Sequence, residues 1–311
     1  MPAWTFVATA NAVCPAGGYP VALDVDPRYW QLDPGQLERF LTRHCRKTRG
    51  HLVDTRTGRP VAAVAPVDLL GHPADLAAIT ALAGAYEISV VEDAAQALGA
   101  TCHGHPAGGS GLAAASFNAN KLITAGSGGA IFTSDDHAAR RARYLINQAR
   151  DHPVEYRHGE PAWNYRMTNL HAAVGCAQLE RATCLITAKQ RIYARYTSEL
   201  SGIKGIRFQD EAPWATATRW LATIVLDPEV TPITGPQLRA ALAQDGIQAG
   251  PPWTPLHQTG AHRNCAPWPC PVAEHLGRDA LHLPSSPTLT EDQQNRVVAA
   301  VRAAIGQPAR T

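Results

Sequence analysis

Residues 61–93 carry the pattern that most restricts the fold, because they read as a strand, a helix and a second strand in succession. The apolar run VAAVAPV (61–67) predicts a buried strand, Pro73 opens a predicted helix over PADLAAITALAGAYE, and ISVVED (88–93) predicts the next strand. Two strands joined in this way lie parallel, with a right-handed crossover. In such sheets ligands collect beyond the carboxyl ends of the strands, where Asp93 stands. The sequence therefore predicts an α/β fold with a site near Asp93.

A second strand–helix pattern precedes this unit. YPVALDVD predicts a strand, and Asp33 is the expected N-cap of a helix that begins at Pro34 and runs over PGQLERFLTRHCRK. The basic stretch RHCRKTRGH (43–51) is interpreted as the end of that helix continuing into a solvated loop. With a net charge of +2 and no dense basic tract, the chain gives no indication of nucleic-acid binding.

The remaining chain predicts a linking helix and a smaller unit. Apolar residues at helical spacing predict one long helix from Thr168 to about Leu200. A strand over 219–227, a helix capped by Thr234 and stopped by Gly246, and a last helix after Thr290 with Gln293 in a capping box follow. The Pro- and Trp-rich segment 250–271 is long and irregular, which favours a binding loop. We expect a large domain over residues 1–184 and a linking helix with a small domain over residues 185–311.

Composition excludes several classes of protein. Of the 311 residues, 45% are hydrophobic and 17% are charged, which is typical of a globular chain. No apolar run is long enough to span a membrane, and no charged region precedes the apolar start as in a signal peptide. The seven cysteines are scattered without a C-x-x-C pair, so we expect no metal site and reduced thiols in a cytoplasmic protein.

Lys121 is isolated among small and polar residues, with no other lysine, arginine or acidic residue from Thr101 to Ser134. A lysine forms a Schiff base only when its amine is neutral, and a dry pocket lowers its pKa. The alternative is a lysine at the lip of a loop whose amine reaches water. Composition alone favours neither interpretation.

Asp93 favours the first interpretation. It follows a predicted buried strand and precedes Lys121 by 28 residues. Pyridoxal 5′-phosphate (PLP) acts as an electron sink while its ring nitrogen stays protonated, and a carboxylate paired with that nitrogen keeps it so. Taken alone, Asp93 would be read as a helix cap. Ser116 and the following AGSGG offer hydroxyl and backbone N–H donors to a phosphate, although such a pattern is more often a turn.

Five stretches together resemble the DegT/StrS-type PLP-dependent sugar aminotransferases: TFVATANAV, DVDPRYWQLDP, EDAAQALGA, SFNANKLITAGSGGAI and NYRMTNLHAAVGCAQLER. The likeness runs in family order from Pro2 to about Thr290. It is greatest to the branch that aminates UDP-linked 4-keto-6-deoxy sugars. The resemblance implies PLP fold type I, with a mostly parallel large-domain sheet between helices and a smaller C-terminal α/β domain. It also implies transfer of an amino group from L-glutamate to a nucleotide-linked keto sugar.

The resemblance implies a role for each matching position. Lys121 matches the lysine that forms the Schiff base with PLP and later moves the proton, and Asp93 matches the partner of the ring nitrogen. Gln96 matches a residue near the ring hydroxyl, Ser116 matches a phosphate ligand, and Phe6 matches the aromatic side chain stacked on the cofactor.

Two further matches concern the partner and the substrate. Asn164 matches an asparagine that reaches the phosphate of the neighbouring subunit, so a homodimer with shared sites is implied. His257 matches part of the sugar-nucleotide pocket.

The chain departs from the family in three places. A segment with a Ser-Gly-Thr-x-Ala-Leu motif is expected ahead of Pro2 and does not occur, so either the start was assigned too late or cofactor affinity is weakened. Asp68 stands where the branch has histidine, and Gly250 where it has arginine. These departures leave open a non-catalytic relative that binds a sugar nucleotide or a partner protein. A sugar dehydratase of the same fold would carry histidine in place of Lys121.

Overall fold

The strands of the N-terminal half pair into a parallel series that ends in one antiparallel strand. In the computed structural model, which describes residues 1–306, β3 (Ala63–Val64) lies parallel to β4 (Ser89–Val90), and β5 (Glu92–Asp93) parallel to β8 (Leu112–Ser116). A parallel bridge from Val67 to Asp93 continues the first pairing into the second. The antiparallel strand β9 (Gly129–Thr133) follows β8 at the edge. The predicted parallel strand–helix–strand unit is therefore confirmed, in short strands.

The first helices confirm one predicted cap and correct two boundaries. The Asp33 side chain accepts from the N–H of Gly35 and opens α2 (Pro34–Arg43), after α1 (Ala8–Val13). The prediction that α2 continues through residue 47 is wrong, because β1 (Cys45–Thr48) and β2 (His51–Asp54) form an antiparallel hairpin over most of the stretch interpreted as a solvated loop. α3 (Leu76–Ala85) begins after Pro73, because Asp75 supplies the cap to the N–H of Ala78.

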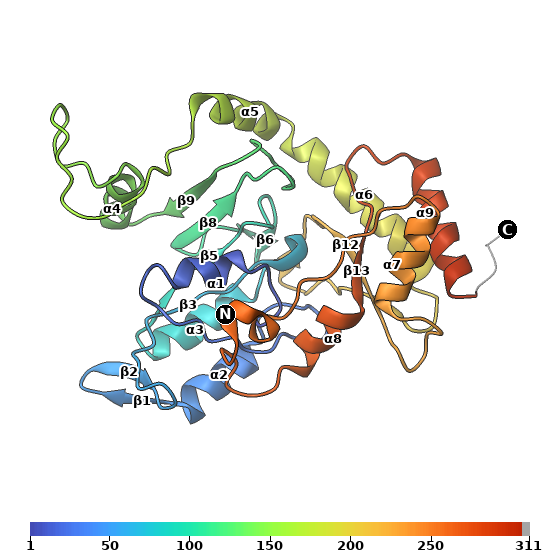
Figure 1. Cartoon of the computed structure of the whole chain (residues 1–311), viewed down its shortest axis with the longest axis horizontal. Coiled ribbons are helices and arrows are strands. Elements are labelled where there is room, and N and C mark those ends of the chain that lie inside the picture. Colours follow the sequence, from blue (N-terminus) through green and yellow to red (C-terminus); the bar gives the residue numbers. More distant parts are fainter. Residues whose placement is uncertain (307–311) are drawn as a thin grey trace.

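The prediction of a strand over YPVALDVD is also wrong. Only isolated bridges occur there, from Leu23 to Pro2 and from Val25 to Leu32. A small antiparallel sheet pairs β6 (Thr101–Cys102) with both β7 (His105–Pro106) and β11 (Ala215–Thr216). α4 (Asp136–Ile146) follows β9, and the segment after it projects away from the rest of the molecule (Figure 1).

Two helices stand where one was predicted. α5 (Asn169–Glu180) and α6 (Ala182–Leu200) are separated at Arg181, whose φ of −101° and ψ of 4° leave the helical region. They lead from the β8–β9 region to the C-terminal helices (Figure 1), and the role of a link between two domains stays a prediction.

The C-terminal part packs helices on an antiparallel sheet of β10 (Ile206–Phe208), β12 (Ala222–Leu226) and β13 (Ala280–Leu283). The capping residues Thr234 and Thr290 open α7 (Gly235–Gln244) and α9 (Glu291–Ala304) as predicted, each with a complete capping box. The predicted irregular segment contains the short 3-10 turns η2 (Leu256–Gln258) and η3 (Gly260–His262), after η1 (Leu69–Gly71) earlier in the chain, and α8 (Pro271–Asp279) follows.

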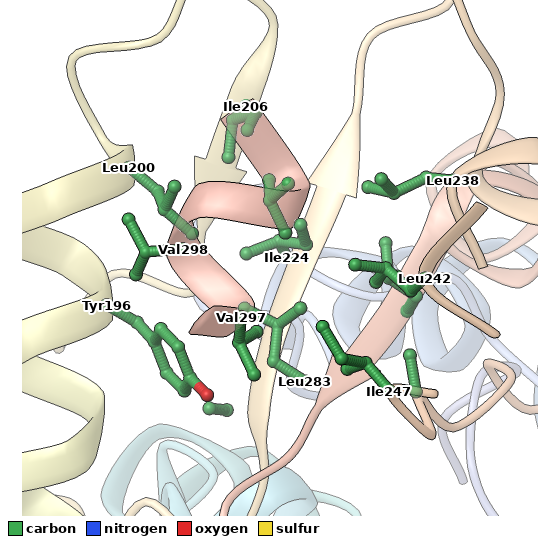
Figure 2. Packing of buried hydrophobic residues seen from close by; sticks show 14 of the residues in the cluster. Tyr196, Leu200, Ile206, Ile224, Leu238, Leu242, Ile247, Leu283, Val297 and Val298 are labelled. Atoms are coloured by element: carbon green, nitrogen blue, oxygen red, sulfur yellow. The ribbon is translucent and has the colours of Figure 1, made fainter. Parts of the chain in front are cut away.

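One hydrophobic core lies wholly within residues 192–305. Figure 2 shows Leu200 of α6 and Val298 of α9 beside the strand residue Ile224, with Leu242 of α7 on the other side. A second core joins Met1 and Trp4 to α8, so the first residues of the chain pack against a helix of the C-terminal half. The division at residue 184 stays a prediction. Among the helices of residues 1–306, none is long and apolar enough to cross a bilayer.

Candidate active site

Asp93 ends β5 with its carboxylate held by two donors. The Thr9 hydroxyl donates to Oδ2 at 2.6 Å, and the N–H of Ala95 donates to Oδ1 at 3.0 Å. Thr9 lies in α1, which therefore contributes to the same edge of the sheet. No lysine, arginine or histidine in residues 1–306 forms an ion pair with Asp93. The carboxylate is thus oriented by neutral donors and is open to a cationic group.

Lys121 is half-buried beyond the carboxyl end of the neighbouring strand β8. Burial lowers the pKa of its amine, and the charge of Asp93 acts in the opposite direction. Asp93 is therefore near enough to influence Lys121 electrostatically. The alternative of a fully solvated amine does not describe this lysine, since its Nζ lies 4.3 Å from the centre of the Trp220 ring.

Ser116 lies in β8, Gln96 follows β5 and Phe6 precedes α1. Ser116 ends β8 and its Oγ accepts from the N–H of Asn118 at 3.3 Å. Gln96 is buried, and its Oε1 accepts from the N–H of Leu70 at 2.8 Å. Phe6 is 53% exposed, so one aromatic face remains free for a stacking partner.

Asn164 lies at a different place. It lines a cleft of about 770 Å³ with β9, α4 and the start of α5, and neither Lys121 nor Asp93 lines that cleft. In the described residues no hydrogen bond or ion pair connects Asn164 to Lys121.

His257 is also apart from the pair. Its Nε2 lies 3.1 Å from Oε1 of Glu274 in α8, and its buried Nδ1 has no hydrogen-bond partner within residues 1–306. The free nitrogen gives His257 one remaining polar contact to make.

Sequence reasoning missed the residues that support the site. Thr9 holds Asp93, and its only signal was its place in TFVAT. Trp220, which covers Lys121, comes from the C-terminal half, 99 positions further along the chain than Lys121, and had no signal. Behind Asp93 the buried carboxyl groups of Asp68 and Glu92 lie within hydrogen-bonding reach of each other, and burial beside Glu92 raises the pKa of Asp68.

Comparison with known proteins identifies the family of the chain. The sequence matches the DegT/DnrJ/EryC1/StrS aminotransferase family over residues 1–302. EpsN of Bacillus subtilis is 36% identical over 304 residues, covering 95% of this chain and 74% of EpsN. A GDP-perosamine synthase of Caulobacter vibrioides is 35% identical over 304 residues, covering 97% of this chain and 77% of the synthase.

The fold matches as well. The crystal structure of a DegT/DnrJ/EryC1/StrS aminotransferase from Brucella abortus superposes with a TM-score of 0.86 at 28% identity, over 98% of this chain and 79% of that one. The α/β architecture and the sequence of this chain therefore both match known members. The chain belongs to the DegT/DnrJ/EryC1/StrS family of PLP-dependent sugar aminotransferases.

Proposed function

We propose that the chain is an aminotransferase that binds PLP covalently through Lys121 and transfers an amino group from L-glutamate to a nucleotide-linked keto sugar of the 4-keto-6-deoxy hexose class. The observation that carries the proposal is the half-buried amine of Lys121 under the electrostatic influence of Asp93, at the carboxyl ends of adjacent parallel strands. The relative named GDP-perosamine synthase favours a nucleotide-linked substrate.

The residues present fit PLP. The Asp93 carboxylate has no cationic partner among residues 1–306, and neither does Lys121 have an acidic one. Asp93 would keep the ring nitrogen protonated, Ser116 would hold the phosphate, Gln96 would lie near the ring hydroxyl and Phe6 would cover one face. When bound, PLP supplies an electron sink that makes the neighbouring C–H bond acidic.

Lys121 then has one task in addition to binding the cofactor. Because burial lowers its pKa, a larger share of the amine is neutral near pH 7 than for an exposed lysine, and Nζ can accept the proton and return it. The hydrogen bonds of Thr9 and Ala95 keep the Asp93 carboxylate fixed while this happens.

We also propose a homodimer in which Asn164 serves the partner's site and His257 contributes to the sugar-nucleotide pocket. Support comes from apolar side chains that are exposed over α5 and the projecting segment before it. Tyr156 is 87% exposed and Leu170 is 82% exposed, which single chains rarely tolerate in such number.

The finer architecture and the compartment complete the proposal. Residues 1–184 would form the large domain around a mostly parallel sheet, and residues 185–311 the linking helix and small α/β domain. The seven cysteines are unpaired, which suits the reducing cytoplasm.

The test has two stages with one matched control. Protein reconstituted with PLP should show a visible absorption band that Lys121→Ala removes and that Lys204→Ala, at an exposed lysine, retains. Incubation with L-glutamate and a panel of keto-sugar nucleotides should then give a product identified by its higher mass, because an amino group and a hydrogen replace the carbonyl oxygen. Sugar-nucleotide binding without a Lys121-dependent band would instead indicate the non-catalytic relative.

A further inference from the structure

Trp220 lies between two of the four lysines of the chain (Lys47, Lys121, Lys189 and Lys204). The Nζ of Lys121 stands 4.3 Å from the centre of its ring, and the Nζ of Lys189 donates to its carbonyl oxygen at 2.8 Å. The indole Nε1–H donates to the carbonyl of Asn120, the residue before Lys121, at 2.9 Å. Trp220 is 5% exposed, so the indole is held on several sides.

Lys189 has no counter-ion to explain its burial. It lies in α6, is 6% exposed, and forms no ion pair with any residue of the 1–306 range. Among residues 1–306, the only hydrogen bond of its side chain is the one to the Trp220 carbonyl. A buried cation without a partner costs stability, so a purely structural role would be served better by an apolar side chain of similar length.

We propose that Trp220 is a positioning residue for Lys121 and that Lys189 fixes Trp220 in place. The inference rests on the proposed function, in which the Lys121 amine is alternately joined to the cofactor and free. In the free state the indole face receives the amine and keeps it from swinging into solvent. Lys189 donates a hydrogen bond to the Trp220 backbone, and the Trp220 ring makes a cation–π contact with Lys121.

An aromatic face suits this task better than a carboxylate. A buried ion pair would hold the ammonium strongly and keep it protonated, whereas a cation–π contact holds it weakly enough to be left. The hydrogen bond from the indole to Asn120 also ties the ring to the loop that carries Lys121. The ring and the amine therefore keep the same relative position although they come from different halves of the chain.

The contact can be measured without cofactor. With only four lysines, protein carrying lysine labelled with 13C at Cε gives four resolvable ε-CH2 signals. The Lys121 signal should be shifted upfield by the indole ring current relative to Lys47 and Lys204, which are exposed. A Lys121 signal that coincides with those of the exposed lysines overturns the proposal.

Two substitutions separate the ring face from the indole N–H. Trp220→Leu should move the Lys121 signal to the chemical shift of the exposed lysines. In a pH titration it should also weaken the preference for the ammonium form of Lys121 by roughly two- to thirtyfold. Trp220→Phe should keep part of the upfield shift, because a ring face remains. Equal signals in the Leu and Phe variants contradict a role of the ring face.

Lys189→Met tests the anchor in a chain that keeps Trp220. Its Lys121 signal should move toward that of Trp220→Leu, while Lys204→Met should leave it unchanged. An unchanged Lys121 signal in Lys189→Met shows that Lys189 does not fix Trp220, and this readout serves also if Trp220→Leu does not fold.

Turnover supplies the functional readout. Trp220→Leu should lower kcat severalfold with KM for the sugar nucleotide little changed, and Trp220→Phe should recover most of kcat. A kcat unaffected in Trp220→Leu overturns the positioning role. The two proposals fail separately: loss of the Lys121-dependent PLP band defeats the proposed function, whereas the NMR signals of PLP-free protein judge only the contact.

Discussion

The hydroxyl of Thr9 reaches across 84 positions of sequence to donate a 2.6 Å hydrogen bond to Oδ2 of Asp93. With the N–H of Ala95 on the other oxygen, the carboxylate has a fixed plane before any ligand arrives. Preorganisation of this kind lowers the cost of binding, because the protein group need not be ordered when the cationic ring nitrogen approaches.

Removal of the Thr9 hydroxyl should weaken PLP binding. A hydrogen bond to a charged group contributes about 1.5–3 kcal/mol, so Thr9→Val should raise the PLP dissociation constant at least tenfold. Thr9→Ser, which keeps the hydroxyl, is the control. Titration of the PLP absorption band measures both variants, and wild-type affinity in Thr9→Val would show that Asp93 needs no such support.

The pair of buried carboxyl groups behind Asp93 should make stability depend on pH. Asp68 Oδ2 has no donor among the described residues, and Glu92 already accepts from the N–H groups of Gly108 and Ser110, so the neutral form of Asp68 is favoured beside this carboxylate. The folded state raises the pKa of Asp68 above 3.8, and its first cause is burial. Above pH 3.8 the folded chain therefore holds a proton that the unfolded chain has lost, and stability falls as pH rises toward the folded pKa.

Asp68→Asn should remove this loss, because the amide donates to Glu92 at every pH. In urea unfolding at pH 5 and pH 8, the variant should have the higher free energy of unfolding, and its difference from wild type should be larger at pH 8. Asp93, Asp75 and Cys102 also act near Asp68 and are unchanged in both proteins, so the difference reports on position 68. A difference in unfolding free energy that does not change with pH would show that Asp68 does not hold this proton.

Gly250 and His282 are coupled by contact. Their backbones exchange hydrogen bonds of 2.8 and 2.9 Å, and a Cβ added at Gly250 would lie 3.3 Å from the His282 side chain. Gly250→Ala should cost about 1 kcal/mol, and this cost should fall only in part in the His282→Ala background, because the contact with Cδ2 is removed while the contact with Cβ remains. Denaturant unfolding of the four proteins measures the coupling, and strict additivity would refute it.

The exposed apolar face should associate with a second copy. Leu170→Glu, on α5, should shift the protein toward monomer in analytical ultracentrifugation, because a charge would be buried without a partner in the dimer. Val230→Glu changes a residue that is 39% exposed and lies away from α5, so it should leave the mass unchanged. A monomeric wild-type protein would refute the dimer.

Local signals in the sequence predicted some elements correctly. Asp33, Thr234 and Thr290 cap helices at the predicted residues, because capping depends on a few neighbouring atoms. Helix ends without such a signal were predicted less well. The hairpin at Cys45–Asp54 is local, with Thr48 opposite His51 across the turn at Arg49–Gly50, so a turn signal was present and was interpreted as a loop. The helical periodicity of the apolar residues does not mark the break at Arg181.

The candidate site divides in the same way. Asp93 could be found because it stands at the end of a predicted strand, and Lys121 because it is isolated in a segment without other charged residues. Thr9, Trp220 and Lys189 could not, because their partners are 84, 99 and 31 positions away and their residue types carry no local signature.

Lys189 should reduce stability at neutral pH and cease to do so in alkali. Burial lowers its pKa from 10.5 to about 8, so between these values the unfolded chain binds a proton that the folded chain does not. Stability from this group therefore rises as pH increases through 8 to 10.5.

Lys189→Met removes the buried charge together with the hydrogen bond to the Trp220 carbonyl, which contributes about 1 kcal/mol. At pH 7 the charge costs about 3 kcal/mol, since each pKa unit corresponds to 1.36 kcal/mol, so the variant should be more stable than wild type. By pH 10 about 0.8 kcal/mol of the charge cost remains, which is close to the contribution of the lost hydrogen bond, so the two proteins should become about equally stable. Urea unfolding at both pH values, with Lys204→Met as control, decides the matter. A variant less stable than wild type at pH 7 would mean that the Lys189–Trp220 contact stabilises the fold outright, and the buried amine would then need no functional reason to be kept.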